Sequence, residues 1–206
     1  IMAYSDRLKI TTARFANVAF SNGSLPLGFI ERLNKRQPWS CPKGIRRFFV
    51  SPQESGELCM VASVLGESGD IVFPKLDEER DMISFEAIAL DLLGYFGLKA
   101  DICATEEEAR QKSLLLDENS ISYPVYFFET DTSGEKPYEE FFTNKEVIDN
   151  DKFAKLGVIK NSVKRDIVEI DGIFQRLRAL FDSGNVTKAE IVDILREFLP
   201  NFEHIE

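Results

Sequence analysis

The chain has 206 residues and a formal net charge of −10, and 44% of its residues are hydrophobic. This length and composition suit one packed domain, or one and a half small ones. No apolar run is long enough to cross a bilayer, and the negative charge disfavours binding to nucleic acids or to anionic membranes.

The cysteines and the histidine exclude further classes of protein. Cys41, Cys59 and Cys103 show no CxxC spacing, and His204 is the only histidine. A disulfide framework, a zinc site and a histidine-dependent triad are therefore disfavoured. Cys41 stays a candidate reactive thiol, although a packed cysteine is the commoner case. Because Ile1–Ile10 lacks the pattern of an export signal, we expect a reduced, cytoplasmic protein.

Turn and capping residues divide the first part of the chain into short elements. Ser51 and Glu54 have the spacing of a capping box, and Pro52 occupies the first helical position, so a helix should begin there. In chain order we predict a helix end at 1–6, a strand at 9–18, a turn at 19–25, a helix from Pro26, a loop at 37–45, a strand at 47–50, a helix at 51–65 and a strand at 70–73.

Helical periodicity dominates the second part. Ser84 should cap an apolar helix that Gly97 ends, and Thr105 with Glu108 should open a charged helix to about Leu116, an insertion on the outside. We then predict a strand at 123–128, a short helix within 134–142 and a helical hairpin at 164–182 and 187–200. The apolar residues of the hairpin suit either a subunit contact or a cover for the core of the chain itself, and we expect the second.

A basic stretch interrupts the acidic chain. Between Arg32 and Arg47 there are six basic residues and no acidic one. Such a stretch suits a small anion such as a phosphate, and it equally suits a solvated surface.

Three segments carry a resemblance to a known family. They are Arg14-Phe15-Ala16-Asn17-Val18 followed by Ser21-Asn22-Gly23-Ser24, Arg47-Phe48-Phe49-Val50 followed by Glu54, and Gly134-Glu135-Lys136 followed by Glu139-Glu140. In this order and spacing they resemble the bacterial nucleotide-sugar 4,6-dehydratases and epimerases of surface polysaccharide synthesis, which are extended short-chain dehydrogenases/reductases. The resemblance covers most of residues 10–140.

The resemblance implies an α/β fold, namely the C-terminal, substrate-binding portion of a Rossmann-type enzyme. Residues 1–20 would end the dinucleotide-binding fold, residues 21–160 would form a substrate-binding α/β subdomain, and residues 161–206 the hairpin. The implied substrate is a UDP-sugar, typically UDP-N-acetylglucosamine, the implied cofactor is NAD or NADP, and a homo-oligomer is expected.

The same resemblance assigns candidate site residues. Asn17 and Arg47 would bind the substrate, because an amide donates to sugar or phosphate oxygens and a guanidinium suits bidentate phosphate contact. The loop Ser21, Asn22, Gly23 and Ser24 would lie beside the nicotinamide and the substrate. A tight turn and a surface ion pair are the structural alternatives for the loop and for Arg47. Arg46 should point away from Arg47, toward solvent.

Other features depart from the family pattern. Asn22 and Thr132 stand where the family commonly has arginine, so two cationic contacts of the family pattern are absent. The chain has no glycine-rich GxGxxG turn and no Tyr-x-x-x-Lys pair in a fitting context. We expect these catalytic and dinucleotide-binding elements upstream of Ile1. A non-catalytic binding or scaffold module derived from the same fold is the alternative.

Overall fold

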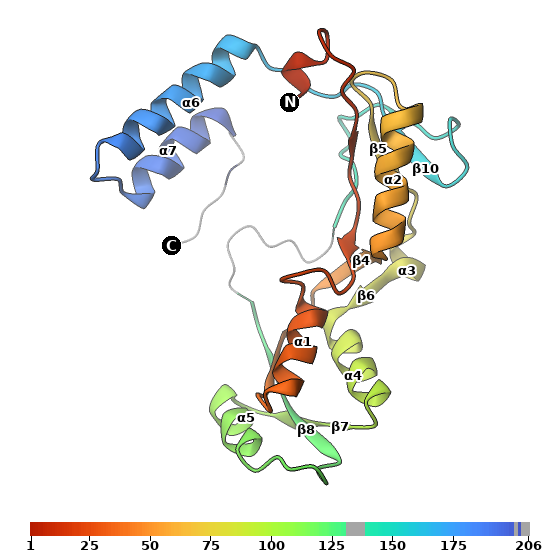
Figure 1. Ribbon diagram of the computed structural model, residues 1–206, viewed down its shortest axis with the longest axis vertical. Helices are drawn as coiled ribbons and strands as arrows, with labels where there is room; N and C mark the ends of the chain where they lie inside the picture. The colour runs from red at the N-terminus through yellow and green to blue at the C-terminus, as the bar shows by residue number, and fades with distance from the viewer. Residues whose placement is uncertain (131–138, 200–201, 203–206) are drawn as a thin grey trace.

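In the part of the chain that the structure describes, three small sheets and the helices that cover them make up an α/β fold (Figure 1). The computed structural model describes residues 1–130, 139–199 and 202. The sheets follow one another along an open arch, and a helical hairpin forms the other end of the arch (Figure 1).

The first sheet has the strand order β1-β5-β10-β9 and lies near the N-terminus. Its strands are β1 (Thr12–Ala13), β5 (Ile71–Pro74), β10 (Leu156–Ile159) and β9 (Ile148–Asp149). β1 runs parallel to β5, whereas β10 is antiparallel to both of its neighbours. Helix α2 (Pro52–Leu65) covers this sheet, because its Leu58 and Ala62 pack against Val72 and Val158. A short 3-10 helix, η1 (Met2–Tyr4), precedes the sheet.

The second sheet carries the candidate site residues Asn17 and Arg47. Its strands are β2 (Asn17–Val18), β4 (Arg46–Val50) and β6 (Met82–Ser84), with β4 in the middle. β2 is parallel to β4, and β6 is antiparallel to it. The short helix α3 (Glu78–Asp81) leads into β6.

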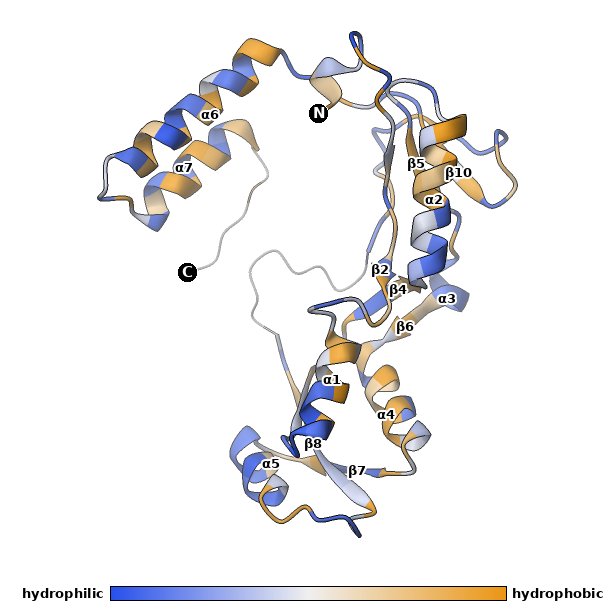
Figure 2. Cartoon of the chain, viewed as in Figure 1, coloured by the Kyte–Doolittle hydropathy of each residue, from blue (hydrophilic) through white to orange (hydrophobic). Residues whose placement is uncertain are grey.

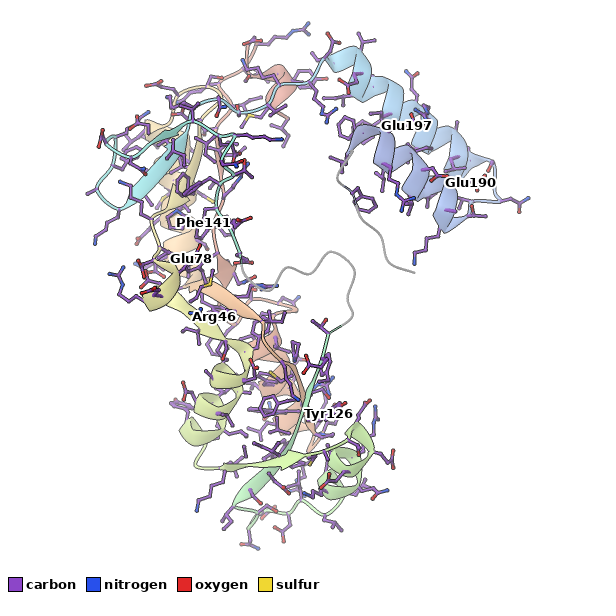
Figure 3. The ribbon with its side chains drawn as sticks, turned by 180° about the vertical axis from the view of Figure 1, so that it is seen from behind. Arg46, Glu78, Tyr126, Phe141, Glu190 and Glu197 are labelled. Carbon is purple, nitrogen blue, oxygen red and sulfur yellow. The ribbon has the colours of Figure 1, made fainter. Side chains whose placement is uncertain are left out.

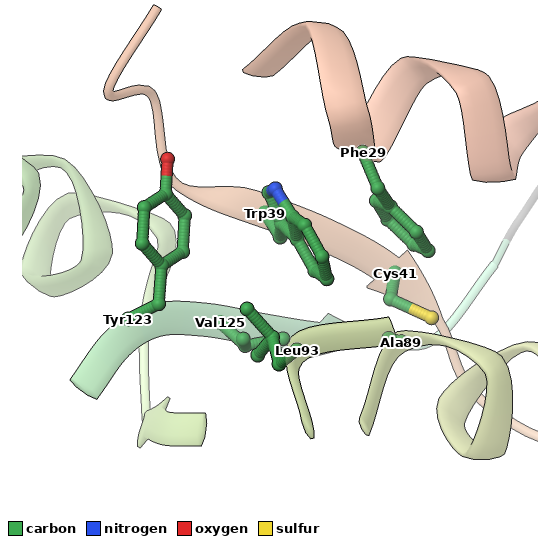
Figure 4. Close-up of a cluster of buried hydrophobic side chains, with 7 residues drawn as sticks. All are labelled: Phe29, Trp39, Cys41, Ala89, Leu93, Tyr123 and Val125. Atoms are coloured by element: carbon green, nitrogen blue, oxygen red, sulfur yellow. The ribbon is translucent and has the colours of Figure 1, made fainter. Parts of the chain in front are cut away.

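The third sheet is parallel, and the largest of the described hydrophobic clusters lies between this sheet and its helices. Its strands are β3 (Trp39–Pro42), β8 (Ser122–Phe128) and β7 (Lys99–Cys103), and its helices are α1 (Leu25–Asn34), α4 (Phe85–Tyr95) and α5 (Glu106–Ser113). Trp39 is fully buried and stacks on Phe29, with ring centroids 4.6 Å apart. Figure 4 shows this cluster, in which side chains from α1, β3, α4 and β8 meet.

The structure corrects the predicted strands. The strand expected at 9–18 is two short strands, β1 and β2, which join different sheets. The segment 37–45, which was expected to be a loop, contains strand β3, and β4 begins just after it at Arg46. Most strand partners lie far apart in sequence, as β3 and β8 do.

Several helices begin at the capping residues that the sequence predicted. Ser51 with Glu54 and Thr187 with Glu190 both form complete capping boxes. Thr105 accepts from the backbone of Glu108, but Glu108 accepts from Ala104 N instead of closing the box. The charged helix α5 packs on β7 and β8 and ends at Ser113, short of Leu116. Of the helix predicted within 134–142, residues 139–142 are not helical, and 134–138 lie outside the described residues.

The hairpin consists of α6 (Ile167–Asp182) and α7 (Lys188–Phe198). The two helices pack on each other, yet no residue of α6 is buried, and Val192 is the buried residue of α7. The hairpin stands beyond the N-terminal end of the sheets (Figure 1). The prediction that it covers the core of the chain was therefore wrong: the sheets are covered by α1, α2, α4 and α5.

Candidate functional site

Two neighbouring parallel strands place Asn17 and Arg47 close together. In the register of β2 and β4, Asn17 lies opposite Phe49, two residues from Arg47 along β4. Asn17 also donates from Nδ2 to the carbonyl oxygen of Phe48, at 3.5 Å. Side chains two residues apart on a strand share one face of the sheet, so the pairing brings the amide and the guanidinium to one site.

Glu139 joins the two side chains. Its Oε1 accepts a hydrogen bond from Asn17 Nδ2 at 3.1 Å and lies 3.6 Å from Arg47 Nε. Arg47 is buried, with 9% of its surface exposed, and its guanidinium also donates to the Arg46 carbonyl and lies 5.9 Å from the Phe85 ring centre. The three segments that carry the sequence resemblance thus meet at one point.

The predicted opposition of Arg46 and Arg47 is confirmed. Arg46 is exposed, whereas Arg47 is buried. Arg46 donates to the backbone carbonyl of Glu78 at 3.1 Å, and Figure 3 shows these two residues at the α3–β6 side of the sheet. The alternation of the pleated strand therefore separates a site arginine from a surface arginine.

A second arginine, Arg14, binds the chain segment that follows Glu139. Arg14, between β1 and β2, binds both carboxylate oxygens of Glu146, at 2.7 and 3.1 Å, and donates to the Phe141 carbonyl at 2.9 Å. These hydrogen bonds from Arg14 are the main cause that lowers the pKa of Glu146 below its ordinary value. Phe141 in turn packs on Phe48 of β4, with ring centroids 5.1 Å apart. Sequence reasoning singled out neither Glu139 nor Glu146 as a site residue.

The loop after β2 is built by local contacts. Ser24 is the N-cap of α1 and accepts from Leu27 N at 3.4 Å, and Gly23 has φ +80°, a conformation that glycine adopts freely. Ser21 is half-buried, and Asn22 and Gly23 are exposed. Ala19 N donates to the Val50 carbonyl oxygen of β4 at 2.9 Å, whereas the described hydrogen bonds of residues 21–24 stay within residues 18–28. Its place at the carboxyl end of β2 is the one predicted, whereas its contact with a ligand stays a prediction.

The basic stretch does not form a single anion site. Arg47 enters the site, Arg32 donates to the Pro38 carbonyl, and Arg36 and Lys43 lie 4.0 and 3.8 Å from the exposed carboxylates of Glu118 and Glu129. Cys41 is fully buried, and burial, with a smaller effect of Glu86, raises its pKa to about 12. The thiol therefore stays protonated and is a core side chain.

The third segment is described in part. Gly134, Glu135, Lys136 and Thr132 lie outside the described residues. Within residues 1–130, 139–199 and 202, no three histidine, cysteine, aspartate or glutamate side chains gather as metal ligands.

The described residues place the Tyr-x-x-x-Lys spacing of the chain outside a single helix. Its one Tyr-x-x-x-Lys spacing is Tyr95 to Lys99, but Tyr95 ends α4, Gly97 breaks the helix with φ +74°, and Lys99 begins β7. The two side chains therefore do not share a helical face. Tyr95 is 83% exposed and lines an apolar hollow of about 370 Å³ with Phe20, Phe49 and others.

Fold and site together define an α/β protein with an arginine, an amide and a carboxylate converging on adjacent parallel strands. A family model described as polysaccharide biosynthesis protein matches residues 2–161, and the chain belongs to this family. The structure of Pen from Bacillus thuringiensis has a similar fold, with a TM-score of 0.55 and 18% sequence identity. The similarity covers 77% of this chain but 42% of the Pen chain, so this chain spans less than half of that protein.

No curated protein sequence matches the chain. Among the helices that the structure describes, none has the length and apolar character needed to cross a membrane.

Proposed function

We propose that this chain is the substrate-binding part of an NAD(P)-dependent nucleotide-sugar 4,6-dehydratase or epimerase. The proposed substrate is UDP-N-acetylglucosamine or a close relative, and the proposed place of action is the cytoplasm. One observation carries the proposal: Asn17 and Arg47 converge on a shared oxygen of Glu139. The family, polysaccharide biosynthesis protein, supports it.

The site offers the donors that a diphosphate needs. Arg47 can present two parallel N–H groups to phosphate oxygens, and the Asn17 amide can donate to a phosphate or sugar oxygen beside it. In the structure both donors are directed at a carboxylate oxygen. A phosphate oxygen of the substrate would take this acceptor position, so that Glu139 and the diphosphate compete for the same donors.

In this proposal the chain holds and orients the sugar. The bound nicotinamide would supply a hydride acceptor and donor. Asn17 and Arg47 would fix the diphosphate, because a sugar anchored at one end presents its ring in one orientation. The loop Ser21–Ser24 would border the sugar at the carboxyl end of β2, where open α/β sheets bind ligands.

Neighbouring arginines provide a matched test of this function. Arg47→Ala should weaken binding of UDP and of UDP-N-acetylglucosamine by roughly ten- to a hundredfold, because a charge-assisted contact is lost. Arg46→Ala removes the same charge from the exposed face of β4 and should leave the affinity within about twofold. Isothermal titration calorimetry measures both, and the near-ultraviolet circular dichroism of the buried Trp39 reports whether each variant is folded.

Two outcomes would contradict the proposal. Equal losses in the two variants would show that overall charge, and not the site, binds the ligand. A folded wild-type chain that binds neither UDP nor the UDP-sugar would favour the alternative function, a scaffold module. The exposed apolar side chains of α6 are the observation that supports this alternative.

A further inference from the structure

A row of exposed side chains runs along α6. Val168, Phe174 and Phe181 have 79%, 66% and 56% of their surface exposed. With Asp171 and Arg178 they follow spacings of three and four residues, which places all five on one side of a helix. We call these five residues the α6 stripe. Figure 2 shows the alternation of hydrophobic and hydrophilic residues along α6.

The α6 stripe lies away from α7. The half-buried residues of α6 that fit the hairpin contact are Ile170, Ile173, Leu177 and Leu180. At 100° per residue they occupy a face centred about a third of a turn from the stripe. The hairpin therefore uses one apolar face internally and leaves the other uncovered by the residues that the structure describes.

The two charges of the stripe are available for an external partner. Asp171 and Arg178 are both exposed. The ion pairs within the described hairpin involve other residues: Arg165 with Glu169, Arg176 with Glu197, and Arg196 with Asp193. Among the described parts of the chain, Asp171 and Arg178 have no ion-pair partner.

Two copies of the α6 stripe are complementary in charge when they lie antiparallel to each other. A two-fold axis that passes between Phe174 and Gln175 sets Asp171 of one copy opposite Arg178 of the other. The same axis sets Val168 opposite Phe181, and both pairings occur twice, as an isologous contact requires. We propose that α6 binds α6 of a second copy of this chain in antiparallel orientation.

The charges select this arrangement over the parallel one. A parallel, in-register contact would place Asp171 against Asp171 and Arg178 against Arg178, and like charges in contact are strongly disfavoured. The aromatic rings supply the contact area, and the ion pairs set direction and register. The family model ends at residue 161, before α6 begins, so this contact is separate from the proposed nucleotide-sugar site.

Charge reversal tests the contact in the whole chain. Sedimentation velocity should show a species of twice the 23.4 kDa chain mass for the wild type. Asp171→Arg and Arg178→Asp should each raise the dimer dissociation constant by about tenfold or more, because each sets like charges opposite each other. The double variant exchanges the two charges and should recover most of the wild-type affinity.

A control variant separates the stripe from the helix as a whole. Arg176→Asp makes the same charge change on α6 but on the side that pairs with Glu197 of α7, and it should leave the dimer within about threefold of the wild type. Far-ultraviolet circular dichroism should show equal helicity in all variants. A monomeric wild type, single variants that dimerise as well as the wild type, a double variant without recovery, or an equal loss in Arg176→Asp would each overturn the proposal.

Discussion

At the scale of single residues, Glu139 sets the charge of the site. Its carboxylate lies 3.6 Å from Arg47 Nε and accepts from Asn17, so it orders the two donors and, in the proposed function, would repel an incoming diphosphate. Glu139→Gln keeps an acceptor oxygen but removes the negative charge. It should tighten binding of UDP by roughly three- to tenfold, the effect of removing one like charge in a partly solvated site. Calorimetric titration with UDP measures the change.

Glu140→Gln is the matched control for this prediction. It removes the same charge from the next, exposed residue and should change the affinity by less than about twofold. Weaker binding in Glu139→Gln would contradict the competition and would show that the carboxylate itself contacts the ligand, for example by accepting from a sugar hydroxyl.

The residue pattern predicted part of the site. The alternation of a strand was sufficient to separate Arg47 from Arg46, because facing depends on local geometry alone. Glu139 was recognised as part of a segment but not as the partner of Asn17 and Arg47. That contact spans more than ninety residues of sequence (from Arg47 to Glu139), and the nearby Arg14–Glu146 ion pair spans a longer stretch still, so no local pattern encodes either contact.

At the scale of elements, a charge cluster ties β5 to β10. Asp70, just before β5, has 2% of its surface exposed and binds Lys160, just after β10, at 2.7 Å and Lys152 at 3.2 Å. Burial raises the pKa of Asp70, but the hydrogen bonds from Lys160, Glu67 N and Lys152 together outweigh it and lower the pKa below its ordinary value of 3.8. The charged form of Asp70 therefore stabilises the fold.

Asp70→Asn should lower the free energy of unfolding by about 1–3 kcal/mol near neutral pH. Because the folded-state pKa is depressed, this contribution is fully present above the ordinary aspartate pKa and is lost as pH falls through the folded-state pKa. The difference between wild type and variant should therefore shrink below about pH 4. Urea unfolding at several pH values measures it. Asp151→Asn, at an exposed position, should show neither effect, and a constant difference across pH would contradict the prediction.

Helices were predicted better than strands for a physical reason. A helix start is marked by residues three apart, as in the capping boxes of Ser51 and Thr187, so the signal and the structure lie in one window of sequence. A strand depends on its partner. The two-residue strand β1 is held by β5, nearly sixty residues later, and a turn-rich segment such as 37–45 becomes a strand because β8 lies beside it.

At the scale of the whole molecule, the hairpin is separable from the sheets. No residue of α6 is buried, and the connection to the rest of the chain includes the ion pair of Lys164 with Asp6. Within the hairpin, Arg165 lies 4.1 Å from the ring centre of Phe198 and donates to its carbonyl oxygen. These contacts indicate that the hairpin is stabilised by its own interactions and is attached at the N-terminal end of the sheets.

Removal of residues 164–206 should therefore leave the sheet region folded. Trp39, the single tryptophan, lies in the core of the third sheet and reports on that region alone. Its near-ultraviolet signal should persist, and the free energy of unfolding followed by its fluorescence should change by less than about 1 kcal/mol, as for a change that exposes no core. The far-ultraviolet helical signal should fall as α6 and α7 are lost. Measurements at low protein concentration keep self-association from adding to the apparent stability of the wild type. Loss of the Trp39 signal in the shortened chain would show instead that the hairpin and the sheets fold as one cooperative unit.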